Sequence, residues 1–146
     1  MIIFSFDFFR YSVPYKQFIK KLLLLQAPRT CWMDINDIYE LIPDFHCTEG
    51  CHDCCQNFGV PSRTRVEDER VKAFLRKNSM QLGEAQGNTC PYLNETGCSI
   101  YPVRPLICRL YGTSPSYRCK MEVMPIRFLH EDEEEEILHL YRTHFF

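Results

Sequence analysis

The sequence lacks several features that mark the commonest classes of membrane and exported proteins. It has no long hydrophobic run: the apolar stretch Leu22–Leu25 is as long as any, whereas a membrane-spanning helix needs roughly 20 apolar residues. No basic leader followed by a small-residue cleavage site opens the chain, since Asp7 and Arg10 interrupt the first apolar residues. We therefore expect a cytoplasmic protein with no membrane span.

The chain also has little net charge and no cofactor fingerprint. Its 17 basic and 19 acidic residues give a formal net charge of −2, with no clustered basic surface of the kind that binds DNA or RNA. No glycine-rich nucleotide motif is present, and the chain is too short to hold both a metal cluster and a cofactor-binding barrel. These absences argue against nucleic-acid binding and weigh against a catalytic role.

What the sequence does have is nine cysteines among 146 residues. A chain of this length can build a core without disulfide staples. Adjacent Cys54 and Cys55 could pair only with strain, and the total is odd, so we expect metal-bound thiolates rather than disulfides. Thiols spaced two or three residues apart can surround one soft metal centre, and Gly50 helps the chain turn there. The dense group consists of Cys47, Cys51, Cys54 and Cys55.

Four more cysteines follow in turn-prone or proline-flanked contexts: Cys90, Cys98, Cys108 and Cys119. Two four-thiolate sites would use all eight, whereas one site would leave reactive spares, and the spacing leaves both arrangements open. His46 and His52 flank the dense group and are alternative ligands. The ninth cysteine, Cys31, lies beside Trp32, and we expect it to be a buried apolar side chain.

The pattern of apolar residues predicts a small α+β or mainly α fold, a single domain with irregular, metal-stabilised loops. Thr64 and Glu67 form a capping box that begins a well-marked helix. The acidic run 132–136 is expected to be the solvated first turn of a C-terminal helix, not a metal site. The other expected elements are a strand over 2–9, a helix between Pro14 and Pro28, a short helix over 36–42, and no long regular element over 82–112.

In two blocks the sequence resembles the CxxCxxCC, or YkgJ-type, cysteine-cluster family of zinc- or iron-chelating domains. The first block is the dense cysteine group, in which the gap Thr48–Gly50 has three residues where the family's name implies two, a variation in loop length. The second block comprises Cys90–Leu93, Gly97–Tyr101 and Arg104–Tyr111. From the extent of this resemblance we expect a metal-binding domain over 34–119, a strand and helix extension over 1–33, and an acidic helical extension over 120–146.

The resemblance implies a set of metal ligands, and two arginines bracket one of them. Arg104 and Arg109 lie on either side of Cys108, where they could offset the negative charge of a thiolate cluster or instead pair with a surface carboxylate such as Glu95. The family also supplies a domain in flagellin lysine methylases, for which an iron–sulfur cluster is implied. We therefore expect a 4Fe-4S cluster, with zinc as the alternative. The implied ligands are Cys47, Cys51, Cys54, Cys55, Cys90, Cys98, Cys108 and Cys119.

The function that these observations favour is that of a redox- or oxygen-responsive accessory protein. The state of its metal would change a surface that docks on a partner enzyme or larger complex. The alternatives are a structural zinc-binding module, a module of a methyl-transfer enzyme, and a metal store or chaperone.

Overall fold

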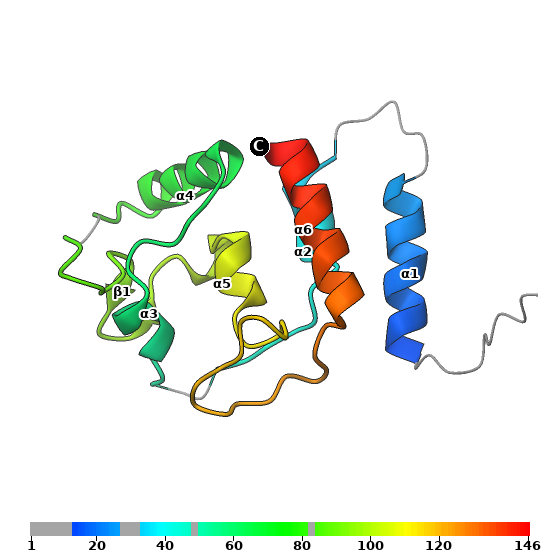
Figure 1. The fold of residues 1–146 in the computed structure, drawn as a ribbon. Helices are drawn as coiled ribbons and strands as arrows, with labels where there is room; N and C mark the ends of the chain where they lie inside the picture. Colours follow the sequence, from blue (N-terminus) through cyan, green and yellow to red (C-terminus); the bar gives the residue numbers. More distant parts are fainter. Residues whose placement is uncertain (1–12, 27–32, 48–49, 82–83) are drawn as a thin grey trace, which may run out of the picture.

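The computed structural model describes residues 13–26, 33–47, 50–81 and 84–146. In these ranges the chain forms six α-helices and one short antiparallel sheet, so the prediction of a small α+β or mainly α fold is confirmed (Figure 1). None of these helices is long and apolar enough to cross a membrane. The predicted strand over 2–9 and Cys31 lie outside the described residues. The elements are α1 (Val13–Gln26), α2 (Ile35–Tyr39), α3 (Asp53–Asn57), α4 (Arg65–Lys77), β1 (Leu93–Asn94), β2 (Gly97–Cys98), a 3-10 turn η1 (Tyr101–Val103), α5 (Leu106–Leu110) and α6 (Glu131–Phe145).

The main hydrophobic core joins four helices from both ends of the chain. Ile38 of α2 and Ile137 of α6 are fully buried where these two helices pack together. Phe18 brings the predicted apolar stripe of α1 onto the same core, and Leu106 and Leu110 add α5, which lies between α4 and α6 in Figure 1. Burying each such side chain contributes roughly 1.5–3 kcal/mol. Within the described ranges, the buried residues of this core include no cysteine.

A second, smaller core lies under the cysteine-rich segments. Val71 and Leu75 from the apolar face of α4 pack there against Cys90, Tyr92 and Ile100. The side chains of two further cysteines rest against this cluster, which places the sulfurs at the edge of the second core rather than of the main one. The two cores therefore divide the molecule into a helical half and a cysteine-containing half.

Helix α2 begins at a capping box that the sequence analysis did not identify. Asp34 accepts a hydrogen bond from the backbone N–H of Asn36 at 2.7 Å, and the Asp34 N–H donates to Asp37 at 3.1 Å. The helix ends at Tyr39, so it is shorter than the expected helix over 36–42. The local cap, rather than the apolar spacing alone, sets where this helix starts.

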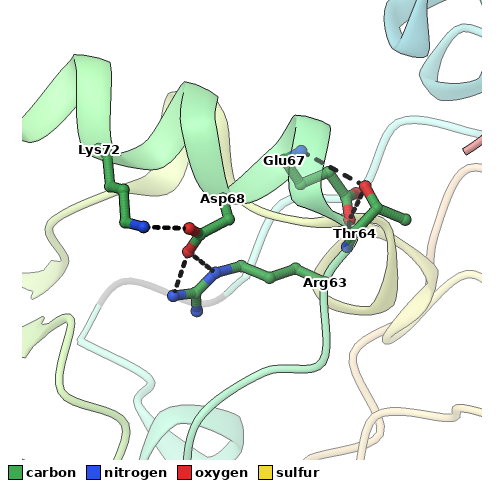
Figure 2. A network of polar contacts seen from close by, with 5 residues as sticks. All are labelled: Arg63, Thr64, Glu67, Asp68 and Lys72. Atoms are coloured by element: carbon green, nitrogen blue, oxygen red, sulfur yellow. Dashed lines mark hydrogen bonds and ion pairs between the residues drawn. The ribbon is translucent and has the colours of Figure 1, made fainter. Parts of the chain in front are cut away.

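The predicted capping box at the start of α4 is confirmed. The backbone N–H of Thr64 donates to Glu67 Oε2 at 2.9 Å, and the Glu67 N–H donates to Thr64 Oγ1 at 3.3 Å (Figure 2). In the next part of the same network Asp68 pairs with Arg63 at 2.7 Å and with Lys72 at 2.5 Å. These contacts fix the first turn of α4 and the chain that enters it.

Glu67 also makes contacts beyond its own helix. The side chain is only 1% exposed. Its Oε1 accepts hydrogen bonds from Tyr39 Oη of α2 and from the Leu106 backbone N–H of α5, both at 2.7 Å. Its Oε2 accepts a hydrogen bond from Tyr141 Oη of α6 in addition to the Thr64 N–H. One buried carboxylate thus joins four helices across both halves of the molecule, and burial together with these bonds raises the pKa of both tyrosines.

The prediction that the acidic run 132–136 is a solvated turn is wrong for two of its residues. Glu133 is 1% exposed and Glu134 is 6% exposed. Both Glu133 oxygens accept hydrogen bonds from the Arg127 guanidinium, at 2.6 and 3.0 Å, and Glu134 accepts one from the Ser116 N–H at 3.4 Å. A bidentate hydrogen bond to arginine offsets the free-energy cost of burying a carboxylate. These two acidic side chains therefore belong to the fold and not to the solvated surface.

Candidate metal centre

A cavity of about 420 Å³ opens in the cysteine-containing half, and six of the eight described cysteines line it. All eight are free thiols. The six come from both sequence groups, so the fold brings together residues that lie more than 30 positions apart in the chain. The lining cysteines are Cys47, Cys54, Cys55, Cys90, Cys98 and Cys108.

Short elements position these thiols. Gly50 has a positive φ of 75°, a conformation that favours glycine, and this turn leads into α3, which carries Cys54 and Cys55. The backbone N–H of Cys90 donates to the Cys55 carbonyl at 2.6 Å, which ties the second cysteine group to the first. Cys98 lies on β2, opposite Leu93. Hydrogen bonds of the backbone therefore hold the two groups together.

Cys108 reaches the cavity from a different kind of element than expected. The sequence placed it in a proline-flanked turn, whereas the structure has it on α5, a helix of five residues. Leu106 and Leu110 of this helix face the main core, while Cys108 lines the cavity. The short helix thus connects the helical half to the thiols.

Cys55 lies between two other thiols. Its S–H can donate to the sulfur of Cys90 or to that of Cys98, and these interactions, followed by burial, raise the pKa of the Cys55 thiol. The same interactions lower the pKa of Cys90 to about 6 and that of Cys98 to about 7. Thiolates are the form that binds metals. Two of the three thiols are therefore close to the metal-binding form at neutral pH.

The remaining lining thiols resist ionisation while no cation is present. Burial, followed by the charges of neighbouring thiolates, raises the pKa of Cys54 to about 12 and that of Cys108 to about 12. Burial and Cys51 likewise raise the pKa of Cys47. Several buried thiolates repel one another, and a metal cation supplies the positive charge that makes them stable. The donor set therefore has the chemistry of a soft-metal site.

Cys51 and Cys119 lie at the margin of the site. Neither is among the residues that line the cavity, yet the charges of both act on the Cys54 thiol. Both side chains are partly buried. The structure thus gathers all eight predicted ligands in one region but brings only six to the cavity wall.

The two predicted arginines have different positions. Arg104 lines the cavity, with its guanidinium 3.8 Å from the centre of the Tyr101 ring. Its buried Nε has no hydrogen-bond partner among the described residues, and a buried cationic donor beside thiols suits an anionic metal–thiolate centre. Arg109 instead lies 4.0 Å over the Tyr39 ring and donates to the Arg104 carbonyl at 3.0 Å. It supports the backbone at Arg104 and does not line the cavity.

Aromatic side chains complete the wall, and the sequence analysis did not select them for this role. Phe58 and Tyr111 have ring centres 5.0 Å apart, and Phe45 closes the cavity next to Gly112. A Cβ at Gly112 would come within 2.6 Å of the Phe45 ring, so glycine is required there. Tyr111 stands in the second family block, but no sequence pattern marked Phe45 or Phe58.

The predicted alternative ligands His46 and His52 do not line the cavity. The described ranges also contain no preformed site for a single metal ion. His46 is exposed, while the His52 ring lies beside Gly97; neither side chain lines the cavity. No group of three or more histidine, cysteine, aspartate or glutamate side chains among the described residues is placed so that it could hold one metal ion. The lining thiols are instead spread around a wide cavity.

Comparison with known proteins gives one match. The sequence profile of the CxxCxxCC family, described as a "putative zinc- or iron-chelating domain", matches residues 46–139. This range contains all eight described cysteines and continues into α6. No curated protein and no solved structure matches the chain. With nearly two-thirds of its length matched, and with thiols from both cysteine groups gathered at one cavity, this chain belongs to the CxxCxxCC family of zinc- or iron-chelating domains.

Proposed function

We propose that the cavity holds an iron–sulfur centre of the 4Fe-4S type on cysteine thiolates. The observation that carries the proposal is the distribution of six thiols around about 420 Å³, many times the roughly 30 Å³ that one water occupies. A zinc ion needs four sulfurs about 2.3 Å from a single point. A cluster binds its thiolates through several separate irons, so it suits donors that are spread around a wall.

The contacts suggest a separate role for each residue at the proposed metal centre. Cys55, Cys90 and Cys98 form one side of the centre, since the Cys55 thiol interacts with both of the others. Cys108 faces them from α5, and the cation of Arg104 offsets the charge of the bound thiolates. An iron–sulfur centre, when bound, supplies one-electron redox chemistry. The surrounding aromatic rings limit the access of water to the sulfurs.

Zinc is the second candidate, and one observation favours it. The Cys55 thiol interacts with those of Cys90 and Cys98, and structural zinc sites use closely spaced thiolates of this kind, although these three are not placed to hold one ion without rearrangement. All-thiolate donors suit zinc as well as iron.

Metal analysis distinguishes the two candidates. Protein purified without oxygen should contain about four irons with an equal amount of sulfide and should show a broad visible absorption band. We expect Cys98→Ser to lose most of this iron because it removes a thiol in the central group. Cys31→Ser is the matched control and should retain it. One or two zinc ions with no visible absorption would refute the iron–sulfur proposal and support the zinc module.

We further propose that the metal centre controls docking on a partner protein in the cytoplasm. Exposed apolar side chains border the cavity: Phe58 is 52% exposed and Val60 is 55% exposed. The Lys120 ammonium lies 5.3 Å from the centre of the Phe58 ring. In the segment that follows Lys120, Met124 and Ile126 are 69% and 85% exposed. Exposed methionine and aromatic side chains are typical of protein-binding sites.

The docking proposal predicts that partner capture depends on the state of the metal. Affinity capture with the metal-loaded protein should recover a partner under anaerobic conditions, and this recovery should fall after exposure to peroxide. Ile126→Ser should reduce capture while leaving the metal content unchanged, because this side chain lies outside the cavity wall. Equal capture by anaerobic and oxidised protein would count against a redox-responsive role.

A further inference from the structure

The carboxylate of Glu67 reaches the helix that carries Cys108, although the two residues lie far apart in the sequence. Glu67 Oε1 accepts the backbone N–H of Leu106 at 2.7 Å, and both residues are 1% exposed. Leu106 is the first residue of α5, and the Cys108 N–H bonds to the Pro105 carbonyl at 3.1 Å within the same turn. The contact with Glu67 is therefore separated from the Cys108 thiol by less than one helical turn.

The position of helix α5 depends on a contact from another element of the fold. The helix has five residues, and its N-cap residue, Pro105, has no side-chain group that could cap the first turn and no N–H to donate. A single helical turn is unstable by itself, so contacts with the rest of the fold must fix its position. A buried Leu106 N–H without an acceptor would also be costly. Glu67 supplies the acceptor that the local sequence lacks.

The carboxylate is itself held rigidly. Tyr39 and Leu106 donate to Oε1, while Thr64 and Tyr141 donate to Oε2. The Thr64 hydroxyl also lies 3.3 Å from Oε2, so each of the two oxygens accepts at least two hydrogen bonds. Any rotation of the group would break at least one of these bonds. Glu67 is thus a fixed point to which the start of α5 is attached.

We infer that Glu67 is a positioning residue for the metal ligand Cys108, acting through the Leu106 backbone N–H. The inference rests on the proposed function, since it requires that Cys108 bind the metal. Glu67 does not line the cavity, but through its hydrogen bond with the Leu106 N–H it holds the Cys108 thiolate at the distance and direction that the metal centre requires. The other lining thiols sit on segments that Glu67 does not touch.

The test isolates the N–H by comparing Leu106→Pro with Leu106→Ala. Both variants lose the buried leucine side chain, but only proline removes the N–H. Proline is tolerated at the first position of a helix, and the extended conformation of Pro105 suits a following proline. Glu67→Asp is the second variant, because it keeps the charge while withdrawing the carboxylate from Leu106. Each full-length protein is loaded anaerobically with ferrous iron and sulfide.

The readout is the alkylation rate of each cysteine, resolved by mass spectrometry, with and without the metal. We expect Leu106→Pro and Glu67→Asp to lose metal protection of Cys108 on the order of tenfold relative to Leu106→Ala, with Cys55, Cys90 and Cys98 still protected. A general loss of stability would instead expose all four thiols together. Equal protection of Cys108 in the proline and alanine variants would overturn the inference while leaving metal binding intact. If metal protected no cysteine in the unaltered protein, the proposed function itself would fail.

Discussion

Removal of the metal is expected to release the cysteine-rich segments 50–62 and 84–104 from the fold while helix α6 stays in place. Ligation at an all-thiolate site contributes on the order of 10 kcal/mol, which is comparable to the whole net stability of a domain of this size. The core beneath these segments is small and consists mainly of Val71, Leu75 and Ile100 with Cys90 and Tyr92.

The helical half should survive because its core does not depend on the thiols. The buried side chains that join α1, α2, α5 and α6 are aliphatic or aromatic within the described ranges. Two backbone bonds, from Cys90 to the Cys55 carbonyl and from Gly59 to the Asn88 carbonyl, connect the cysteine-rich segments to each other but not to that core. We therefore expect partial unfolding rather than complete loss of structure.

Hydrogen exchange followed by mass spectrometry measures this directly. In reduced protein treated with a chelator, amides of 50–62 and 84–104 should exchange as in an unfolded chain, while those of α6 remain protected. The Cys31→Ser variant serves as the control, since Cys31 is outside the predicted ligand set. Unchanged exchange in both segments after metal removal would show that the metal has no structural role.

Glu67→Ala is expected to cost about 4 kcal/mol or more in the free energy of unfolding. The substitution leaves the backbone N–H groups of Thr64 and Leu106 and the hydroxyl groups of Tyr39 and Tyr141 without their acceptor. Each buried donor that loses its partner costs about 1–3 kcal/mol, although water entering the space would recover part of this. An effect of this size is exceptional for one residue, and it follows from the contacts to four helices.

Urea unfolding of the metal-loaded protein gives the measurement. Glu69→Ala is the matched control on the same helix: Glu69 is exposed and pairs with the exposed Arg65 at 3.4 Å, so its loss should change stability by less than about 0.5 kcal/mol. Tyr39→Phe and Tyr141→Phe each remove one hydrogen-bond donor. The stability lost in each should lie between the losses for Glu67→Ala and Glu69→Ala. A cost for Glu67→Ala close to that of Glu69→Ala would refute the assignment of Glu67 as the link between helices.

Local patterns predicted local structure well. The helix that follows Thr64, the apolar stripe containing Phe18 and the C-terminal helix all appear in the structure, because periodicity and capping depend on residues three or four apart. The family resemblance also came from the sequence and is confirmed over residues 46–139. The predicted domain boundaries and the assignment of individual ligands stay predictions.

Long-range packing decided what the patterns could not. Arg109 stands one residue from Cys108, yet its guanidinium lies on Tyr39 because successive residues of a helix point to different sides. The acidic neighbours of Glu133 predict a solvated side chain, but Glu133 is buried and forms an ion pair with Arg127. In both cases the deciding partner is identified only when separate segments are packed together.

The sequence by itself determined that this chain carries thiols for a soft metal, that a capped helix begins after Thr64, and that it belongs to a cysteine-cluster family. Only the tertiary structure decided which six thiols meet at one cavity and that Glu67 links the metal-bearing half to the helical half. The physical reason is the distance over which each kind of contact acts along the chain. A cap joins residues three apart, whereas Glu67 bonds to partners 39 and 74 residues away, whose positions depend on the packing of the whole fold.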